Sequence, residues 1–272
     1  MEVYHGEKRY KYHPITIFNV ERNSHKSIFS VLVGLMAIAT VTALIATEKN
    51  GVCQINSPND SSGDAVYVIE SRCDNHDILV ISHDRHDSMI VCEGARDAIV
   101  FLKSHGLDVT DTIVIELLTE LPDSVDNSAT GCYLESERRV LILVYPEFKK
   151  FETWFGVPVD RSLYRSVVSH EVAHAVADFN FTISKPSIQA KEYIAYITQF
   201  STMEPELRDR VLENFSGKAF EGDWQMSPII YMFDPMGFGI RAYLHFLNLI
   251  DADEYIHSIL NGEALLDISH IY

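Results

Sequence analysis

The stretch SVVSHEVAHAVADFNF, residues 166–181, carries the pattern on which the interpretation of this chain depends. His170 and His174 are four residues apart, so on a helix their side chains lie on one face, one turn apart. The apolar residues around them, which would pack such a helix, are Leu163, Val167, Val168, Val172, Ala175, Val176 and Phe179. We therefore predict a helix over residues 162–179.

The two histidines and the glutamate between them form an H-E-x-x-H pattern. Neutral imidazoles at this spacing bind zinc, and Glu171 sits where a general base can activate a water molecule. A catalytic zinc site needs three protein ligands. Asp178 is eight residues from His170, which is roughly 12 Å along a helix and too far to share one ion. We predict Asp178 to be an outer partner of the site or a surface charge.

Glu192 is the better candidate for the third ligand. It lies on the next predicted helix, residues 187–202, among mostly apolar neighbours. A carboxylate buried there needs a partner, and a metal ion would satisfy it. Two alternatives stay open: Glu192 points to solvent beside Lys191, or both histidines are ordinary polar residues of a core helix.

A second group of histidines, His76, His83 and His86, lies around the segment ISHDRHD. No predicted helix fixes these side chains, and Asp and Arg residues surround them. We interpret the segment as a solvated loop rather than a metal site.

Composition separates a globular part from a membrane segment. Hydrophobic residues make up 47% of the 272, enough for a sizeable core. The formal net charge of -17 argues against nucleic acid as a partner. Residues 27–47 carry no charge, and their apolar run of 19 residues from Ile28 to Ala46 is about long enough to cross a bilayer.

Positive charges are concentrated before the apolar run, which places the N-terminus in the cytoplasm and the rest of the chain outside. The predicted organisation is a tail (1–26), a single transmembrane anchor (27–47), a linker (48–64) and one domain (65–272). The alternative is a secreted protein released by signal cleavage. Four cysteines, Cys53, Cys73, Cys92 and Cys132, follow the segment and predict two disulfides of open connectivity, with buried free thiols as the alternative.

The domain divides into a part with strands and a helical part. Strands are predicted at 66–71, 78–82, 112–118 and 140–145, with 132–134 beside the last. A helix is predicted at residues 93–105. Residues 89–92 form either a third strand or the lead-in to this helix. After Pro158 helices are predicted at 162–179, 187–202, 206–214, 238–249 and 253–260, with Pro186, Pro205, Pro228 and Pro235 marking breaks. This order favours an α+β fold over an alternating α/β fold.

His170-Glu171-x-x-His174, followed after 17 residues by Glu192, resembles the gluzincin branch of the zinc metallopeptidases. The segment HEVAHAVADF is similar to the active-site helix of thermolysin-like peptidases. The resemblance implies a zincin-like fold, Zn²⁺ held by His170, His174 and Glu192, and Glu171 as general base. It also implies an edge strand that holds extended substrate, for which residues 140–145 are the candidate, and a helix at 93–105 behind the active helix.

The chain departs from the thermolysin-like pattern at Tyr196, which stands where those enzymes carry an aspartate that orients a ligand histidine. Tyr196 is therefore a candidate outer residue of the site. Candidates for a transition-state donor are Tyr231, Tyr243 and His245. Overall, the chain is most similar to uncharacterised membrane-anchored or secreted bacterial proteins with a predicted zincin core.

Two functions are consistent with these observations. The first is an extracytoplasmic, membrane-anchored zinc peptidase that acts on peptide or protein substrates. The second is an inactive zincin-like module that recruits a partner at the membrane surface. The sequence does not predict the substrate or the oligomeric state.

Overall fold

The structure is a computed structural model, and it describes residues 68–73, 78–123, 125 and 129–266. The predicted tail, anchor and linker, residues 1–26, 27–47 and 48–64, lie outside the described residues. Within the described part of the chain, no helix combines the length and the hydropathy that a bilayer span requires.

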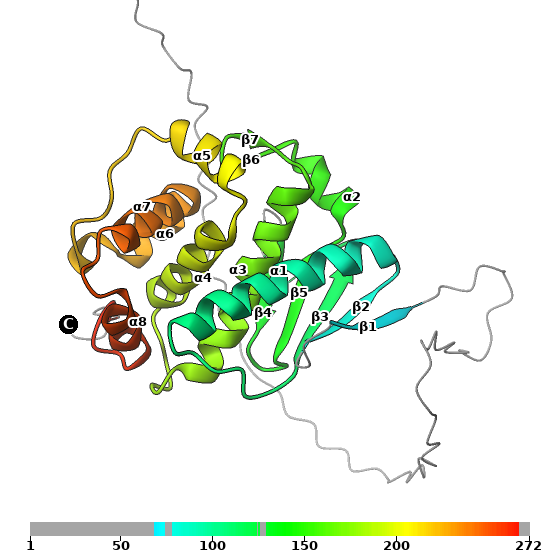
Figure 1. Ribbon diagram of the computed structural model, residues 1–272, viewed down its shortest axis with the longest axis horizontal. Helices are drawn as coiled ribbons and strands as arrows, with labels where there is room; N and C mark the ends of the chain where they lie inside the picture. Colours follow the sequence, from blue (N-terminus) through cyan, green and yellow to red (C-terminus); the bar gives the residue numbers. More distant parts are fainter. Residues whose placement is uncertain (1–67, 74–77, 124, 126–128, 267–272) are drawn as a thin grey trace, which may run out of the picture. The chain divides into compact units, whose positions relative to one another are not determined.

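Five strands form a mixed sheet in the order β1-β2-β3-β5-β4 (Figure 1). Their bounds are β1 Ile69–Arg72, β2 Ile78–Ser82, β3 Ile113–Leu118, β4 Gly131–Leu134 and β5 Arg139–Leu143. The inner strands β2, β3 and β5 run parallel, while β1 and β4 run antiparallel to their neighbours at the two edges. Val80, Ile115 and Val140 on the inner strands are fully buried, so one side of the sheet contributes to the core.

Helices dominate the rest of the domain. α1 (Arg85–Ser104) connects β2 to β3, and α2 (Tyr145–Phe148) follows β5. A two-stranded ribbon, β6 (Thr153–Trp154) and β7 (Val157–Pro158), leads into the helical part. That part consists of α3 Arg161–Asn180, α4 Ile188–Thr202, α5 Pro205–Glu213, α6 Pro228–Phe233, α7 Pro235–Leu247 and α8 Ala252–Leu260. This order confirms the predicted α+β class.

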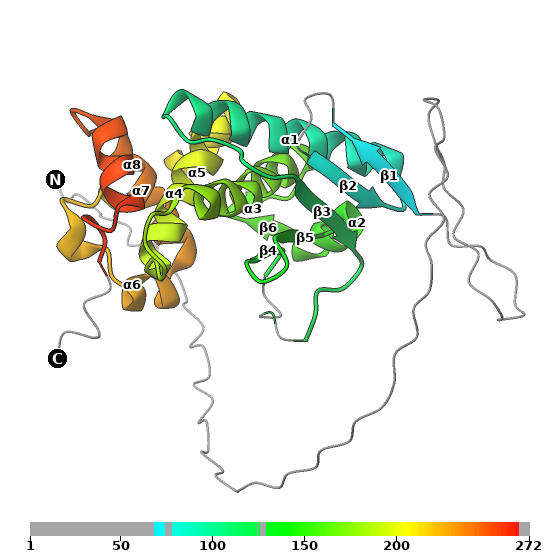
Figure 2. The same ribbon diagram turned by 90° about the horizontal axis from the view of Figure 1, so that it is seen from below.

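The central helix is α3, which contains the H-E-x-x-H pattern. The Asp160 carboxylate accepts a hydrogen bond from the Leu163 backbone N–H at 2.8 Å and caps its first turn. α3 packs against α1, α4 and the strands β4 and β5 (Figure 2). Gly94 permits the close approach of α1, because a Cβ there would lie 2.5 Å from the Arg165 carbonyl oxygen. The predicted backing of the active helix by residues 93–105 is therefore confirmed.

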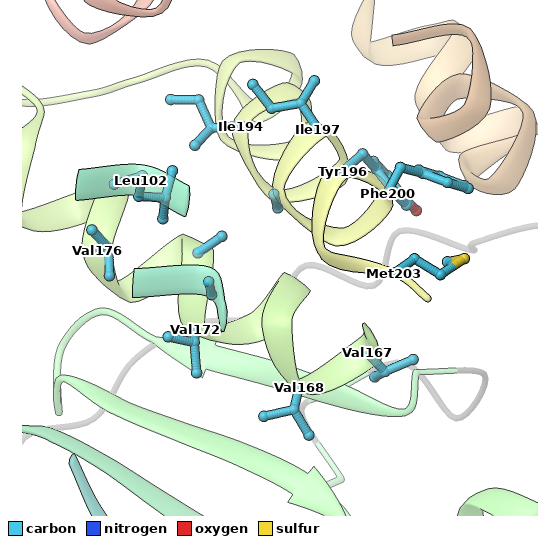
Figure 3. Packing of buried hydrophobic residues seen from close by; sticks show 14 of the residues in the cluster. Leu102, Val167, Val168, Val172, Val176, Ile194, Tyr196, Ile197, Phe200 and Met203 are labelled. Carbon is cyan, nitrogen blue, oxygen red and sulfur yellow. The ribbon is translucent and has the colours of Figure 1, made fainter. Parts of the chain in front are cut away.

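Apolar side chains fill the space between these helices (Figure 3). Val168, Val172 and Val176 on α3 are buried together with Leu102 on α1. Ile194, Ile197 and Phe200 extend the same core through α4. This packing surrounds α3 on most sides and fixes the position of its polar residues.

Two local predictions were wrong, and a third was incomplete. Residues 89–92 belong to α1, which begins at Arg85, so they form neither a strand nor a lead-in. The segment around His83 and His86 is only partly a loop: the Asp84 side chain accepts hydrogen bonds from the backbone N–H groups of His86 and Asp87 and starts the helix. Pro228 and Pro235 begin α6 and α7, where a missing N–H costs nothing, so each break is also a helix start.

One predicted disulfide is present. Cys73 and Cys92 are bonded across a sequence separation of 19, and they tie the end of β1 to α1. Among the described residues Cys132 has no disulfide partner, and Cys53 lies outside them. The Cys73–Cys92 bond excludes the two connectivities that pair these residues with other cysteines.

Candidate metal centre

The two histidines of α3 face each other across one helical turn. Their Nε2 atoms are 3.2 Å apart, and their rings meet edge to face with centroids 4.9 Å apart. Glu192 reaches this point from α4: its Oε2 lies 3.5 Å from His170 Nε2, and its Oε1 lies 3.6 Å from His174 Nε2. The structure thus brings together the three ligands predicted from the sequence.

The separations between these atoms fit a single small cation. Zinc bonds of about 2.0–2.1 Å in a tetrahedron place neighbouring ligand atoms about 3.3–3.4 Å apart. The observed separations of 3.2, 3.5 and 3.6 Å lie close to that value. No other group of three or more His, Cys, Asp or Glu side chains in the described part of the chain meets the geometry of a metal site.

Burial makes the cluster costly without a positive charge at its centre. Glu192 Oε2 is buried and has no hydrogen-bond partner, although an unpaired buried carboxylate oxygen is strongly unfavourable. Burial would raise the pKa of Glu192, but the adjacent His174 and His170 hold it below its ordinary value. Burial lowers the pKa of His174 to about 4, which favours the neutral imidazole that a metal requires.

His170 has a different environment. Burial acts to lower its pKa, but the adjacent carboxylates of Glu192 and Glu171 raise it overall. Its Nδ1 is buried and has no hydrogen-bond partner. Tyr196 packs edge to face on the imidazole, with ring centroids 4.5 Å apart.

Glu171 lies beside the ligands on the same helix. It is buried, with 7% of its surface exposed, and it lines the cleft that contains the three ligands. Burial raises its pKa to about 7, the charge of Glu192 adds to this increase, and His170 opposes it. Gly131 provides the space for this side chain, because a Cβ at Gly131 would lie 2.8 Å from Glu171 Cγ.

The cleft has a volume of about 940 Å³ and runs along an edge of the sheet. That edge is β4, whose residues Gly131, Cys132 and Tyr133 line the cleft. The prediction that residues 140–145 form the edge strand was wrong, because β5 lies between β3 and β4. Cys132 also lies near Glu171: burial and then the charge of Glu171 raise the pKa of its thiol to about 11.

The three candidate donors occupy different places. Tyr231 on α6 lines the cleft close to Glu192. Burial, reinforced by the charge of Glu192, raises the pKa of Tyr231 well above its ordinary value, so it stays protonated. Tyr243 stacks on Phe200 at 5.3 Å, and His245 Nδ1 lies 2.8 Å from the Tyr193 hydroxyl. Neither Tyr243 nor His245 is among the described residues that line the cleft.

The two candidate outer residues both lie at the cleft. Asp178 is not a ligand, and its Oδ2 accepts a hydrogen bond from the Tyr133 hydroxyl at 2.9 Å. Tyr196 is 7% exposed and contacts His170 as described. Gly239 on α7 permits this position, because a Cβ there would lie 2.4 Å from the Tyr196 ring.

Sequence reasoning missed two residues of the site. Gln199 is 2% exposed, lines the cleft, and follows Glu192 by seven residues on the same face of α4. This seven-residue spacing from Glu192 could have indicated that Gln199 faces the site. Gly131 was missed because its role depends on the approach of β4 to α3, which no local pattern encodes. The other predicted histidines are not part of the centre: His83 and His86 lie at the start of α1, and His76 is outside the described residues.

Comparison with known proteins gives one result. A family model described as "Family of unknown function (DUF6639)" matches residues 78–269, which include every residue of the candidate centre. No curated protein and no solved structure matches the chain.

Proposed function

The chain belongs to the family of unknown function DUF6639, and for this member we propose a zinc-dependent peptidase with a zincin-like domain. The observation that carries the proposal is the triangle of His170, His174 and Glu192, whose ligand atoms all lie within 4.8 Å of one another. These three residues would hold the zinc ion. Zinc bound at such a site polarises a peptide carbonyl and makes a water molecule acidic enough to attack it near neutral pH.

Glu171 is the proton carrier in this proposal. It lies next to the ligands, and its raised pKa of about 7 suits a group that accepts a proton from water and then donates it to the leaving amine. Its position is restricted by the β4 backbone at Gly131. Tyr231 keeps its phenolic proton and faces the same cleft, so it can donate a hydrogen bond to the oxygen on which negative charge develops.

Substrate binding is assigned to β4. An edge strand leaves one row of backbone N–H and C=O groups unpaired within its sheet, and an extended peptide can add to it as a further strand. β4 lines the cleft that contains Glu171 and the three ligands. A peptide bound there would pass the proposed catalytic residues with its backbone in a fixed register.

We also propose that the domain acts outside the cytoplasm, attached by the apolar segment 27–47 or released from it. The Cys73–Cys92 disulfide supports this location, because disulfides persist mainly in oxidising compartments.

The test uses the metal content and the turnover of the purified protein. We expect about one zinc per chain in the wild type and little in His170→Ala and Glu192→Ala. Glu171→Gln should keep its zinc and lose hydrolysis of an unfolded casein substrate by at least about 100-fold, the order of a general-base contribution. Undiminished hydrolysis by Glu171→Gln would exclude the mechanism. Zinc binding without hydrolysis of any peptide pool would favour the inactive binding module.

A further inference from the structure

The short helix α6 is apolar on all sides. Its sequence PIIYMF, residues 228–233, contains no charged side chain. Ile230 packs against the hydrophobic core, and Tyr231 lines the cleft beside Glu192. Ile229, Met232 and Phe233 share another face, because they are spaced i, i+3 and i+4. These three side chains form the outer face of α6, which is open to solvent: Ile229 is 64% exposed, Met232 73% and Phe233 83%.

The outer face of α6 is continuous with the candidate catalytic cleft. Met232 and Phe233 also line the cleft, and so does Ile188 at the start of α4, which is 41% exposed. The apolar surface therefore begins at the mouth of the cleft and extends away from it. Contiguous exposed apolar surface of this kind marks a site of binding rather than a general feature of monomeric proteins.

Charges near this surface limit what can bind to it. Glu221, Asp223 and Asp234 flank α6 in the sequence, so the region repels anionic lipid surfaces and acidic peptides. Lys191 is the single lysine among the described residues that line the cleft, and it is ion-paired with Glu135. No arginine is found among those described residues, so they offer no fork of donors for a free C-terminal carboxylate.

We propose that the outer face of α6, formed by Ile229, Met232 and Phe233, is a subsite for a large apolar side chain of a polypeptide substrate. The inference rests on the proposed function and adds a substrate class to it: internal, non-acidic segments that are rich in large apolar residues. A peptide paired with β4 directs alternate side chains to opposite faces, so one set of side chains points toward the walls of the cleft. The occupant of the outer face is then a residue close to the cleaved bond.

The test measures which bonds are cleaved and how strongly peptides bind. The wild type, Met232→Ser and Phe233→Ser are incubated with a pool of acetylated and amidated peptides of known sequence, and cleavage sites are determined by mass spectrometry. The matched control is Val100→Ser, which changes a residue that is 63% exposed on α1 and outside the cleft. Binding is measured in parallel in the zinc-loaded Glu171→Gln background, with a blocked, fluorescein-labelled hexapeptide that has Leu-Phe at its centre.

We expect the wild type to prefer a large apolar residue at one position beside the cleaved bond. Phe233→Ser should reduce kcat/KM at such sites roughly tenfold, and it should weaken binding of the labelled hexapeptide by a similar factor. At sites that carry alanine in that position, kcat/KM should change less than about twofold. Val100→Ser should match the wild type. An identical cleavage profile and affinity in all variants would overturn the inference while leaving the peptidase intact.

Failure of the proposed function gives a different result. If the wild type cleaves nothing but Phe233→Ser still weakens hexapeptide binding, the peptidase is excluded and the subsite is retained as part of a binding module. If neither cleavage nor binding is found, both proposals fall. Binding to phosphatidylcholine–phosphatidylglycerol vesicles, or self-association in sedimentation, that Phe233→Ser abolishes would assign the outer face of α6 to another occupant.

Discussion

The burial of Glu171 is expected to lower the unfolding free energy of the metal-free protein at neutral pH. The pKa of this carboxyl rises from its ordinary 4.5 to about 7, chiefly because burial disfavours the ionised form. Replacement by glutamine keeps the size of the side chain and removes the ionisation. The difference in unfolding free energy between the wild type and Glu171→Gln therefore reports the cost of ionising this group in the folded state.

The sign and size of the effect follow from the two pKa values. Between pH 4.5 and about 7 the carboxyl loses its proton in the unfolded state but keeps it in the folded state, so the wild type loses stability as pH rises. Above pH 7 both states are ionised and the loss is complete. One pH unit corresponds to about 1.4 kcal/mol, so the total is about 3 kcal/mol. Glu171→Gln should be about equal to the wild type near pH 4.5 and about 3 kcal/mol more stable at pH 8.

Urea unfolding in the presence of a chelator, at half-unit steps from pH 4.5 to 8.5, measures this difference. Glu120→Gln, which alters an exposed glutamate, is the matched control and should show no pH-dependent difference from the wild type. Zinc should shrink the advantage of Glu171→Gln, because a bound cation stabilises the nearby ionised carboxylate. A difference that stays constant with pH, or a glutamine variant that is less stable at pH 8, would refute the reasoning.

Three further predictions follow from the contacts described. Gly131→Ala should lower kcat/KM by about 10–100-fold with zinc content unchanged, because the new Cβ would displace Glu171; equal activity would contradict the contact. The Cys73→Ala/Cys92→Ala double variant should lose about 3 kcal/mol in urea unfolding, given a separation of 19, whereas a change below 1 kcal/mol would argue against a constraining role. Zinc at about 100 times its Kd should stabilise the wild type by about 2.7 kcal/mol in thermal or urea unfolding, and Glu192→Ala should abolish this gain.

The cluster of candidate ligands could be predicted from the sequence because helical spacing alone determines most of its geometry. Two histidines four residues apart necessarily share a helix face, and α3 forms where its apolar residues predict it. The place of Glu192 in the cluster could be predicted for a related reason: a carboxylate buried in an apolar helix needs a partner. These inferences depend on local structure and on the cost of burial, and both can be evaluated without knowing the fold.

The order of the strands could not be predicted in the same way. VLILVY, residues 140–145, was the candidate for the edge strand that the resemblance implied. A continuous apolar run is typical of a strand buried between neighbours, which is where β5 lies. β4 gave a weaker signal because an edge strand beside an open cleft is only partly buried. The apolar run of β5 was therefore evidence for an inner strand and against an edge strand.

α6 was not predicted because it is too short. Six residues between two prolines are too few to establish a 3.6-residue period, so Pro228 and Pro235 were interpreted as breaks alone. The same segment then supplies Tyr231 to the cleft and an apolar face to solvent.

The environment of His170 bears on the chemistry proposed for the site. A carboxylate hydrogen-bonded to a ligand imidazole fixes its orientation and increases its basicity. Here Tyr196 contacts His170 edge to face, and Gly239 allows α7 to pack closely against the tyrosine ring. Gln199, hydrogen-bonded to Ser166 at 3.4 Å, is the neutral polar group on the same side. If a metal ion binds here, we expect it to be a stronger Lewis acid than one whose ligand histidine is hydrogen-bonded to an aspartate, because an aromatic ring contacts this imidazole instead of a further carboxylate.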